Sequence, residues 1–249
     1  AYTAWWQKDS KLSAPKNSNL KTVMDFSFYD KINIAKNEQT ETWFKGLDRI
    51  YGNFVYDFLY PNPASVLAFI ENHDTDRFLG EGQNLAMLKQ ATTLLLTTRR
   101  IPQLYYGTEI MMNGVKTKSD GYVRCDFPGG WAGDKQNAFT AEGRTELQNE
   151  CYNFYKTILN WRKGNDVIAK GSMTQFMVQN GVYAYARQYE GKTVFVMLNG
   201  TDSETTLPLK FYKEILKDTK QGKDILTGRT ISFTEDLKMA ARESLVIEL

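Results

Sequence analysis

The sequence predicts an α/β fold, in which parallel strands alternate with helices, followed by a smaller antiparallel β domain. Two observations carry this prediction. Up to about residue 165, short apolar runs alternate three times with stretches in which apolar residues recur at helical spacing. From about Gly171 the apolar and polar residues alternate with the period of a strand instead. We therefore expect residues 1–169 in the α/β part and residues 170–249 in the β domain.

The α/β part begins with a polar, loop-like stretch and then forms three strand–helix units. The expected elements are, in order, strand 20–26, helix 42–58, strand 66–71, helix 84–98, strand 102–106 and helix 145–163. Asn84 is the expected N-cap of the second helix, since its side chain can accept from a free backbone N–H. Thr145 and Gln148 form a capping-box pattern at the start of the third helix.

The β domain is expected to open with a hairpin. Alternating runs over 173–178 and 182–187 flank Asn180–Gly181, a dipeptide that favours the tight turns of hairpins. Further strands are expected over 193–198 and 245–249.

Three strand–helix units are too few to close a barrel and leave both edges of the sheet unpaired, which invites aggregation. We therefore expect the chain to be part of a larger protein, or a fragment held against the remainder of it. The chain starts at Ala1 with no charged-then-apolar leader, which indicates a processed or truncated end.

The composition excludes several classes of protein. Hydrophobic residues make up 42% and charged residues 24% of 249, as in ordinary soluble globular proteins. The net charge of +2 comes with dispersed cations, so nucleic acid is not an expected partner. No run approaches the roughly 20 apolar residues of a membrane span. Cys125 and Cys151 have no metal-site spacing, and either a disulfide or two free thiols is compatible with the sequence.

The densest cluster of reactive side chains follows the second predicted strand. The apolar run over 66–70 ends in Glu71, and His73, Asp74, Asp76 and Arg77 follow within six residues. His73 is the single histidine of the chain. Because catalytic groups of parallel α/β proteins collect just past the carboxyl ends of strands, we expect the functional site here.

Three motifs resemble the α-amylase superfamily, glycoside hydrolase family 13. Residues 69–74 (Phe-Ile-Glu-Asn-His-Asp) resemble the end of that family's seventh barrel strand, and residues 101–109 resemble its eighth strand. Residues 120–131 resemble the loop after the eighth strand, and their Asp-Phe-Pro-Gly-Gly-Trp form is typical of the neopullulanase, cyclomaltodextrinase and maltogenic-amylase branch. The resemblance covers essentially the whole chain. It implies the C-terminal part of a (β/α)8 TIM barrel followed by a β-sandwich domain.

The resemblance also implies a retaining glycosidase of α-glucans. Such an enzyme needs a nucleophilic Asp and an acid/base Glu about 5–5.5 Å apart, which this family carries on its fourth and fifth strands. The resemblance places both upstream of residue 1, so we expect the 249 residues alone to be inactive. Glu71, Asp74 and Asp76 cannot replace them, because they share one strand tip and cannot flank a sugar from two sides.

The resemblance assigns four polar residues to the sugar. Asp74 matches the third carboxylate, which hydrogen-bonds the hydroxyls beside the scissile bond and favours the distorted ring of the transition state. His73 matches the imidazole that donates to the same sugar. Asp120 and Arg124 match a pair that grips the next glucose on the non-reducing side.

Four more residues are candidate substrate contacts. The rings of Tyr106, Phe127 and Trp131 suit the C–H faces of pyranoses, although Tyr106 fits a core position equally well. Arg77 is either a substrate contact or one half of an ion pair with Asp74 or Asp76.

Other residues are assigned away from the sugar. Trp5, Trp6 and Trp43 are expected in the core, with a distal sugar subsite as the alternative. Arg100 stands where the family usually has glycine, and we expect it to alter only the entry of the strand, away from the sugar.

The expected substrates are maltooligosaccharides, cyclodextrins or pullulan-type glucans. Cleavage at α-1,4 links is expected, and cleavage at α-1,6 links is left open. Two alternatives remain open: an α-glucan transglycosylase, and a non-catalytic glucan-binding protein on the same fold. No cofactor is expected in this segment, and calcium would be bound by the N-terminal remainder. Export to the periplasm or the extracellular space is favoured, since polymer-degrading members are often exported.

Overall fold

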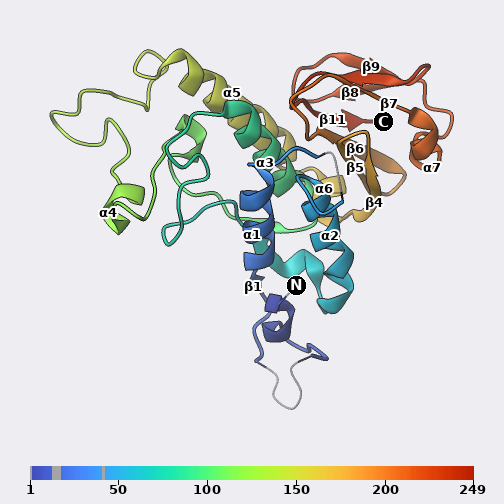
Figure 1. Cartoon of the computed structure of the whole chain (residues 1–249), viewed down its shortest axis with the longest axis horizontal. Helices are drawn as coiled ribbons and strands as arrows, with labels where there is room; N and C mark the ends of the chain where they lie inside the picture. The colour runs from blue at the N-terminus through green and yellow to red at the C-terminus, as the bar shows by residue number, and fades with distance from the viewer. Residues whose placement is uncertain (1, 13–17, 41–42) are drawn as a thin grey trace.

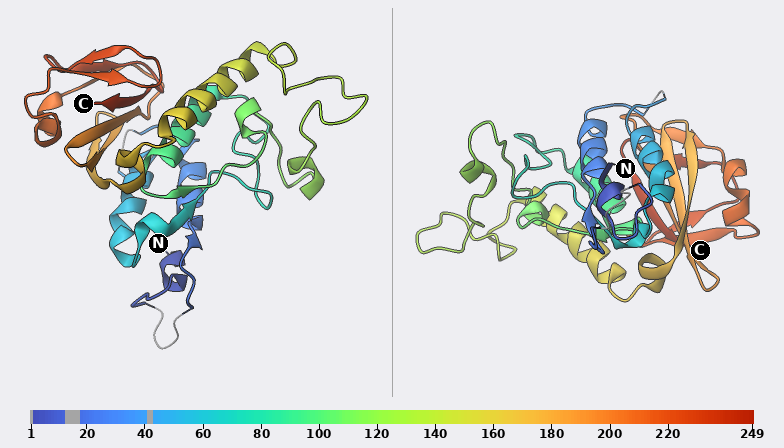
Figure 2. Two further views of the ribbon diagram at one scale, coloured as in Figure 1. Left: turned by 180° about the vertical axis from the view of Figure 1, so that it is seen from behind. Right: turned by 90° about the horizontal axis from the view of Figure 1, so that it is seen from below.

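The computed structural model describes residues 2–12, 18–40 and 43–249. A small parallel sheet with its helices lies beside an antiparallel β domain, and a long irregular arm that carries helix α4 leaves on the other side (Figure 1). The two further views show the arm and the β domain at opposite ends of the molecule (Figure 2).

The parallel sheet has three short strands in chain order. These are β1 (Val23–Met24), β2 (Val66–Ala68) and β3 (Ile101–Pro102). Val23 lies opposite Val66, and Leu67 lies opposite Ile101, both in parallel register. The predicted alternation of parallel strands and helices is confirmed. Within the described ranges, no strand pairs with the outer edge of β1 or of β3.

Strand β1 is shorter than predicted because a helix begins directly after it. Asp25 caps helix α1 (Phe26–Ala35), and its carboxylate accepts from the backbone N–H of Phe28. The strand predicted over 20–26 is therefore wrong at its carboxyl end, and α1 was not predicted.

The helix predicted over 42–58 is shorter and starts later. Helix α2 spans Asp48–Val55 and continues as the 3-10 turn η2 (Tyr56–Leu59). Phe44 and Gly46 have φ angles of 64° and 55°, in the left-handed region that a right-handed helix excludes. The predicted start at Thr42 lies outside the described residues.

The other two predicted helices are confirmed. Helix α3 spans Leu85–Thr97 with Asn84 as its N-cap, and α5 spans Glu146–Arg162 behind the predicted capping box. The remaining short elements of this part are η1 (Tyr2–Trp6), η3 (Pro63–Ser65), η4 (Thr108–Ile110), α4 (Asp120–Val123) and α6 (Asp166–Lys170).

The β domain consists of a six-stranded and a two-stranded antiparallel sheet. The larger sheet has the order β4 (Ser172–Gln179), β5 (Val182–Tyr189), β6 (Lys192–Asn199), β11 (Ser244–Glu248), β8 (Gln221–Asp224), β9 (Thr230–Ser232). The smaller sheet pairs β7 (Thr205–Leu207) with β10 (Leu237–Met239), and η5 (Leu209–Tyr212) and α7 (Lys213–Leu216) complete the domain. Asn180 and Gly181 both have positive φ, as the predicted hairpin turn requires.

The two parts share one hydrophobic core. A single buried cluster runs from the helices α3 and α5 to the larger sheet and includes Leu94, Leu95, Tyr155, Tyr185 and Val196. A second cluster, with Phe195, Met197, Leu207 and Met239 among its members, lies on the opposite face of that sheet beneath the two-stranded sheet. The larger sheet is therefore covered on both faces.

A buried ion-pair cluster lies where β3 begins. The guanidinium of Arg100 is fully buried, with Nε 3.1 Å from Asp25 Oδ2 and a second ion pair to Asp57. Asp57 also pairs with Arg99 at 2.8 Å. Arg100 thus links the start of β3 to the N-cap of α1 and to the first turn of η2, which is a larger structural role than the change of strand entry that the sequence suggested.

Candidate functional site

Glu71 is the buried anchor of the loop that follows β2. Its carboxylate is 2% exposed and accepts from the Thr108 hydroxyl, the Phe78 backbone N–H and Arg77 Nη1. Burial raises the pKa of Glu71, although each of these donors acts to lower it. Glu71 therefore joins the loop after β2 to the turn after β3 and offers no oxygen to a ligand.

Arg77 lies behind the site and is completely buried. Its Nη1 donates to Tyr106 O at 2.6 Å and its Nε to Val123 O at 3.0 Å, while its guanidinium carbon lies 4.0 Å from the Tyr105 ring centroid. Its ionic partner is Glu71, at 3.2 Å, and the expected ion pair with Asp74 or Asp76 is not formed. Complete burial also leaves Arg77 no surface for a sugar contact, so it positions the loops instead.

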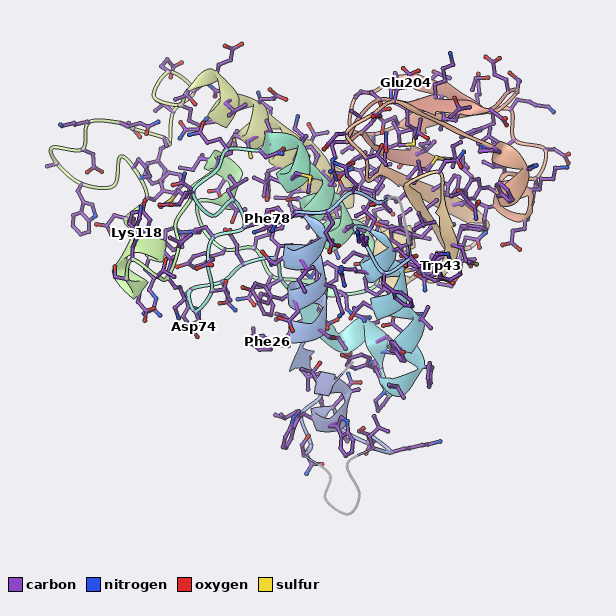
Figure 3. The ribbon with its side chains drawn as sticks, in the orientation of Figure 1. Phe26, Trp43, Asp74, Phe78, Lys118 and Glu204 are labelled. Carbon is purple, nitrogen blue, oxygen red and sulfur yellow. The ribbon has the colours of Figure 1, made fainter. Side chains whose placement is uncertain are left out.

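In front of this buried pair, a cluster of exposed polar groups surrounds Asp74, whose side chain is 63% exposed (Figure 3). His73 Nε2 lies 3.2 Å from Asp74 Oδ2, and Arg124 Nη2 lies 3.0 Å from Asp74 Oδ1. Arg124 Nε also donates to His73 O at 2.8 Å. The structure thus brings together residues that the sequence placed on two separate motifs.

Asp120 lies on the other side of the same arginine. Its Oδ2 is 3.2 Å from Arg124 Nη2, and its Oδ1 is 3.2 Å from Lys116 Nζ. The hydrogen bond from Lys116, followed by the charge of Arg124, lowers the pKa of Asp120. The carboxylate therefore stays ionised at neutral pH and can act as a hydrogen-bond acceptor for a ligand.

Lys116 is a member of the cluster that sequence reasoning missed. Besides its contact with Asp120, its Nζ donates to Asp74 O at 3.0 Å and its backbone N–H donates to Asp76 Oδ1 at 2.6 Å. A lysine in a polar loop carries no local signal for such a role, since most lysines there are solvated.

The turn that carries Asp74 is built by its own side chains. Asn72 Oδ1 accepts from the Asp74 backbone N–H at 2.8 Å, and Thr75 Oγ1 accepts from the Asn72 N–H at 2.9 Å. Asn72 and Thr75 are buried and Asp74 is exposed. The motif is therefore an Asx-type turn that holds one carboxylate out toward solvent.

The predicted aromatic contacts fall into two places. Tyr106 is 41% exposed, and its hydroxyl donates to Cys125 O at 2.7 Å, which places it next to the Arg124 segment. Phe127 packs against Phe139 with ring centroids 4.6 Å apart, and Trp131 is 67% exposed. Both belong to the arm, whose local turn is tied by Asp134 to the N–H of Trp131.

The tryptophans expected in the core are not there. Trp5, Trp6 and Trp43 are 51%, 64% and 72% exposed, so that expectation is wrong. Cys125 and Cys151 are both free thiols, the first exposed and the second buried.

The described residues contain neither a metal-ligand cluster nor a membrane-spanning helix. No group of three or more His, Cys, Asp or Glu side chains in that part of the chain is placed to hold a metal ion. No helix there is both long and apolar enough to cross a bilayer.

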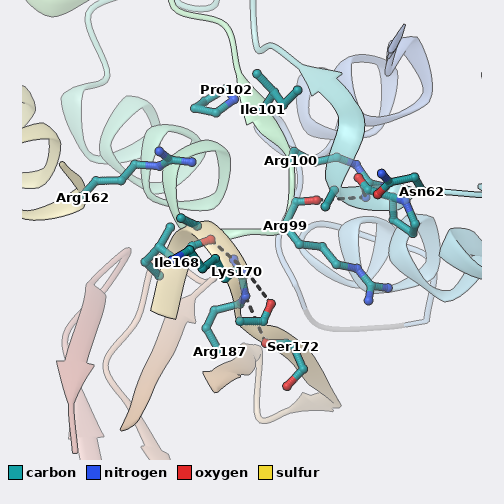
Figure 4. A pocket seen from close by; sticks show the side chains of 14 residues that line it. Asn62, Arg99, Arg100, Ile101, Pro102, Arg162, Ile168, Lys170, Ser172 and Arg187 are labelled. Carbon is teal, nitrogen blue, oxygen red and sulfur yellow. Dashed lines mark hydrogen bonds between the residues drawn. The ribbon is translucent and has the colours of Figure 1, made fainter. Parts of the chain in front are cut away.

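A cationic cavity of about 570 Å³ lies at the start of β3 and is a competing candidate (Figure 4). Its lining includes Arg99, Arg100, Arg162, Lys170 and Arg187, and no carboxylate, imidazole or thiol. Arg187 is almost fully buried and donates to the carbonyls of Thr97, Ile168 and Gly171 at 2.8–2.9 Å. These guanidiniums hold main-chain segments together, and the cavity offers neither an acid nor a base.

Comparison with known proteins gives consistent matches. Residues 173–248 match the family model of the cyclo-malto-dextrinase C-terminal domain. The chain is 30% identical over 220 residues to an α-amylase of Niallia circulans, which covers 85% of this chain and 38% of that protein. It is 29% identical over 228 residues to a cyclomaltodextrin glucanotransferase of Thermoanaerobacterium thermosulfurigenes, covering 88% of this chain and 28% of that protein.

The fold has close counterparts among solved structures. The α-amylase of Geobacillus thermoleovorans, solved in complex with acarbose, superposes with a TM-score of 0.73 at 21% identity, over 93% of this chain and 48% of that one. The chain thus spans less than half the length of the relatives that it matches.

Proposed function

Because this chain belongs to the α-amylase family, glycoside hydrolase family 13, and corresponds to the C-terminal part of its members, we propose that it supplies one side of an active site. The proposed enzyme is a retaining α-glucan hydrolase. The proposed substrates are maltooligosaccharides, cyclodextrins or pullulan-type glucans, cleaved at α-1,4 links. The observation that carries the proposal is the exposed carboxylate of Asp74, which forms an ion pair with Arg124 and lies next to the His73 imidazole.

This arrangement fits the third carboxylate of a glycosidase. Asp74 is tied to Arg124 through one oxygen and faces His73 with the other, so both polar groups can approach the hydroxyls of one sugar ring. Hydrogen bonds from hydroxyls to a carboxylate strengthen as positive charge develops on the ring, and they therefore stabilise the transition state more than the ground state. Arg124 and Asp120 together present a donor and an acceptor to the next sugar.

We propose that the nucleophile and the acid/base lie outside these 249 residues. Among the described carboxylates of this site, Glu71 is buried, and Asp74 and Asp120 share one guanidinium nitrogen. Asp76 accepts from the backbone N–H of Lys116 and lies on the same strand tip as Asp74. A general acid working at neutral pH needs a raised pKa, whereas the pKa of Asp120 is lowered. Any calcium requirement is assigned, in this proposal, to the same outside part of the protein.

The test has two arms. Purified chain 1–249 is expected to release no glucose or maltose from maltotriose, and turnover by this chain that Asp74→Asn abolishes would overturn the composite site. In the whole enzyme, Asp74→Asn is expected to lower kcat by about 10²–10³-fold, the usual loss on removing one transition-state hydrogen bond. Glu81→Gln, an exposed change in the neighbouring loop, is the matched control and is expected to keep kcat.

Transglycosylation is a second candidate, favoured by the similarity to a cyclomaltodextrin glucanotransferase. The residues described here would bind the donor sugar in either reaction, and the difference lies in whether water or a sugar hydroxyl reaches the intermediate. Product analysis at high maltose concentration separates the two, since transfer from maltose forms longer oligosaccharides together with the released glucose, whereas hydrolysis forms glucose alone.

A further inference from the structure

Two aromatic side chains stand out into solvent on the side of the molecule away from Asp74. Trp43 and Phe44 are 72% and 71% exposed, and Figure 3 shows Trp43 beyond helix α1 from Asp74, next to the β domain. Tyr56, at the end of α2, is 52% exposed nearby. Nothing in the proposed active site uses these rings.

The loop that carries the rings is held by hydrogen bonds to Asp48 and Glu38. Phe44 has a φ of 64°, a conformation that costs energy for a bulky residue. Its backbone N–H donates to Asp48 Oδ2 at 2.7 Å, and the Gly46 N–H donates to Glu38 Oε2 at 2.8 Å. Such backbone strain persists only where the surroundings fix it, and it is concentrated at binding sites.

The rings border a groove across α2. A cavity of about 550 Å³ lies between α2 and the tip of the β4–β5 hairpin, and a second of about 320 Å³ lies between α2 and α1. Both are lined by the same four residues, so they form one continuous surface. We call it the α2 groove; its shared lining is Phe44, Asp48, Gly52 and Tyr56.

Gly52 leaves space at the floor of the α2 groove. It lies in the middle of α2, where a glycine makes the helix less stable than an alanine would. A Cβ built there would meet no atom within 4 Å, so packing within the described chain does not require a glycine. Close approach of a ligand to the helix backbone would require one.

The chemistry of the groove indicates the ligand. The larger cavity adds Trp43, Tyr51, Gln179 and Asn180 to the shared lining, and Asp48 is its single charged residue. Aromatic faces suit the C–H faces of pyranose rings, and amide and carboxylate groups suit hydroxyls. The smaller cavity adds Lys31 and Arg49, and these are matched by Asp30 and Asp48. The groove therefore has no excess of positive charge, which disfavours phosphates and anionic lipid surfaces.

We propose that the α2 groove is a second binding site for the α-glucan, separate from the Asp74 cluster. The choice of an α-glucan as ligand rests on the proposed function. A second site on the same protein holds a polymer near the active site and raises its effective concentration there without any new catalytic contact.

The experiment measures binding of maltoheptaose by calorimetry and of amylopectin by retardation in native gels, using chain 1–249. Trp43→Ala removes a ring, and Gly52→Leu fills the floor of the groove. Both are expected to raise the Kd for maltoheptaose at least tenfold and to abolish retardation. Phe211→Ala, which removes a ring of η5 that is 46% exposed, is the control and is expected to leave retardation unchanged.

Each outcome of this experiment either supports or overturns the second site. The second site would be overturned by binding that persists in Trp43→Ala and Gly52→Leu, or by equal loss of binding in Phe211→Ala. Absence of any binding, or equal affinity for cellohexaose, would overturn it as well. Thermal melts that match the unaltered chain show that the variants fold. Retardation through the groove without hydrolysis by the whole enzyme would refute the proposed function alone. If Asp74→Asn abolishes hydrolysis but retardation persists in the groove variants, only the proposed groove site is refuted.

Discussion

One nitrogen of Arg124 lies 3.0 Å from Asp74 and 3.2 Å from Asp120, so a single guanidinium joins the turn after β2 to the start of the arm. The same side chain donates to His73 O at 2.8 Å. Asp74 and Asp120 are thereby held in fixed positions relative to each other, as the two proposed sugar subsites require.

Arg124→Lys is expected to weaken acarbose binding by the whole enzyme about tenfold, or about 1.4 kcal/mol. Lysine keeps the charge but cannot reproduce the planar fork that reaches two carboxylates and a carbonyl. Isothermal titration gives the Kd. Arg229→Lys, in an exposed pair with Glu243 of the β domain, is the control and should bind acarbose normally. Equal affinity in both variants would show that Arg124 does not position the subsites.

Arg100→Met is expected to lower the free energy of unfolding by about 3–5 kcal/mol, because it leaves the buried carboxylates of Asp25 and Asp57 without their shared partner. Urea denaturation followed by circular dichroism measures the change. Lys170→Ala breaks an exposed pair with Asp166 and should leave the urea midpoint where it was. A midpoint that is equally unaffected in Arg100→Met would contradict the role given to the buried cluster.

Glu38→Gln tests the loop that carries Trp43 and Phe44. The hydrogen bond from Arg49 lowers the pKa of Glu38, so its folded-state pKa lies below its usual value of 4.5. Its contribution to stability is therefore complete above pH 4.5 and disappears as the pH falls through the folded-state value. Glu38→Gln should cost about 1 kcal/mol at pH 7 and nothing at the acidic end. Unfolding curves measured between about pH 3 and about pH 7 give this free-energy difference between Glu38→Gln and the unaltered chain. A difference that stayed constant with pH would refute the prediction.

The two thiols are expected to react very differently. Cys125 is exposed, whereas burial raises the pKa of Cys151 to about 12. Because the thiolate is the reacting form, a disulfide reagent at about pH 8 should label one thiol per native chain and the second only in denaturant. Cys125→Ser should remove the fast phase. Rapid labelling of both thiols would show that α5 opens readily around Cys151.

The elements that the sequence predicted well are those with local signals. Helices α3 and α5 carry an N-cap and a capping box, and both occur within one or two residues of the predicted ends. Helix α1 was missed because its first residues, Phe26, Phe28 and Tyr29, favour strands by intrinsic preference. The cap at Asp25 and burial of one helix face override that preference.

The candidate site was predicted in the same uneven way. The motifs identified Asp74, Asp120 and Arg124, and the structure brings these residues into contact. The partners of Arg77 could not be read from the sequence, since three nearby carboxylates are equivalent along the chain. Only the folded loops decide that Glu71 lies behind the turn and Asp74 in front of it.

The core shared by α3, α5 and the larger sheet bears on how this protein can be engineered. A cut near residue 170 would leave Tyr185 and Val196 without the helices that cover them, and Arg187 without the Thr97 carbonyl. The β domain should therefore not survive as a portable module that can be fused to another enzyme. Exchange of the β domain between relatives should succeed more often if helices α3 and α5 are exchanged together with the larger sheet.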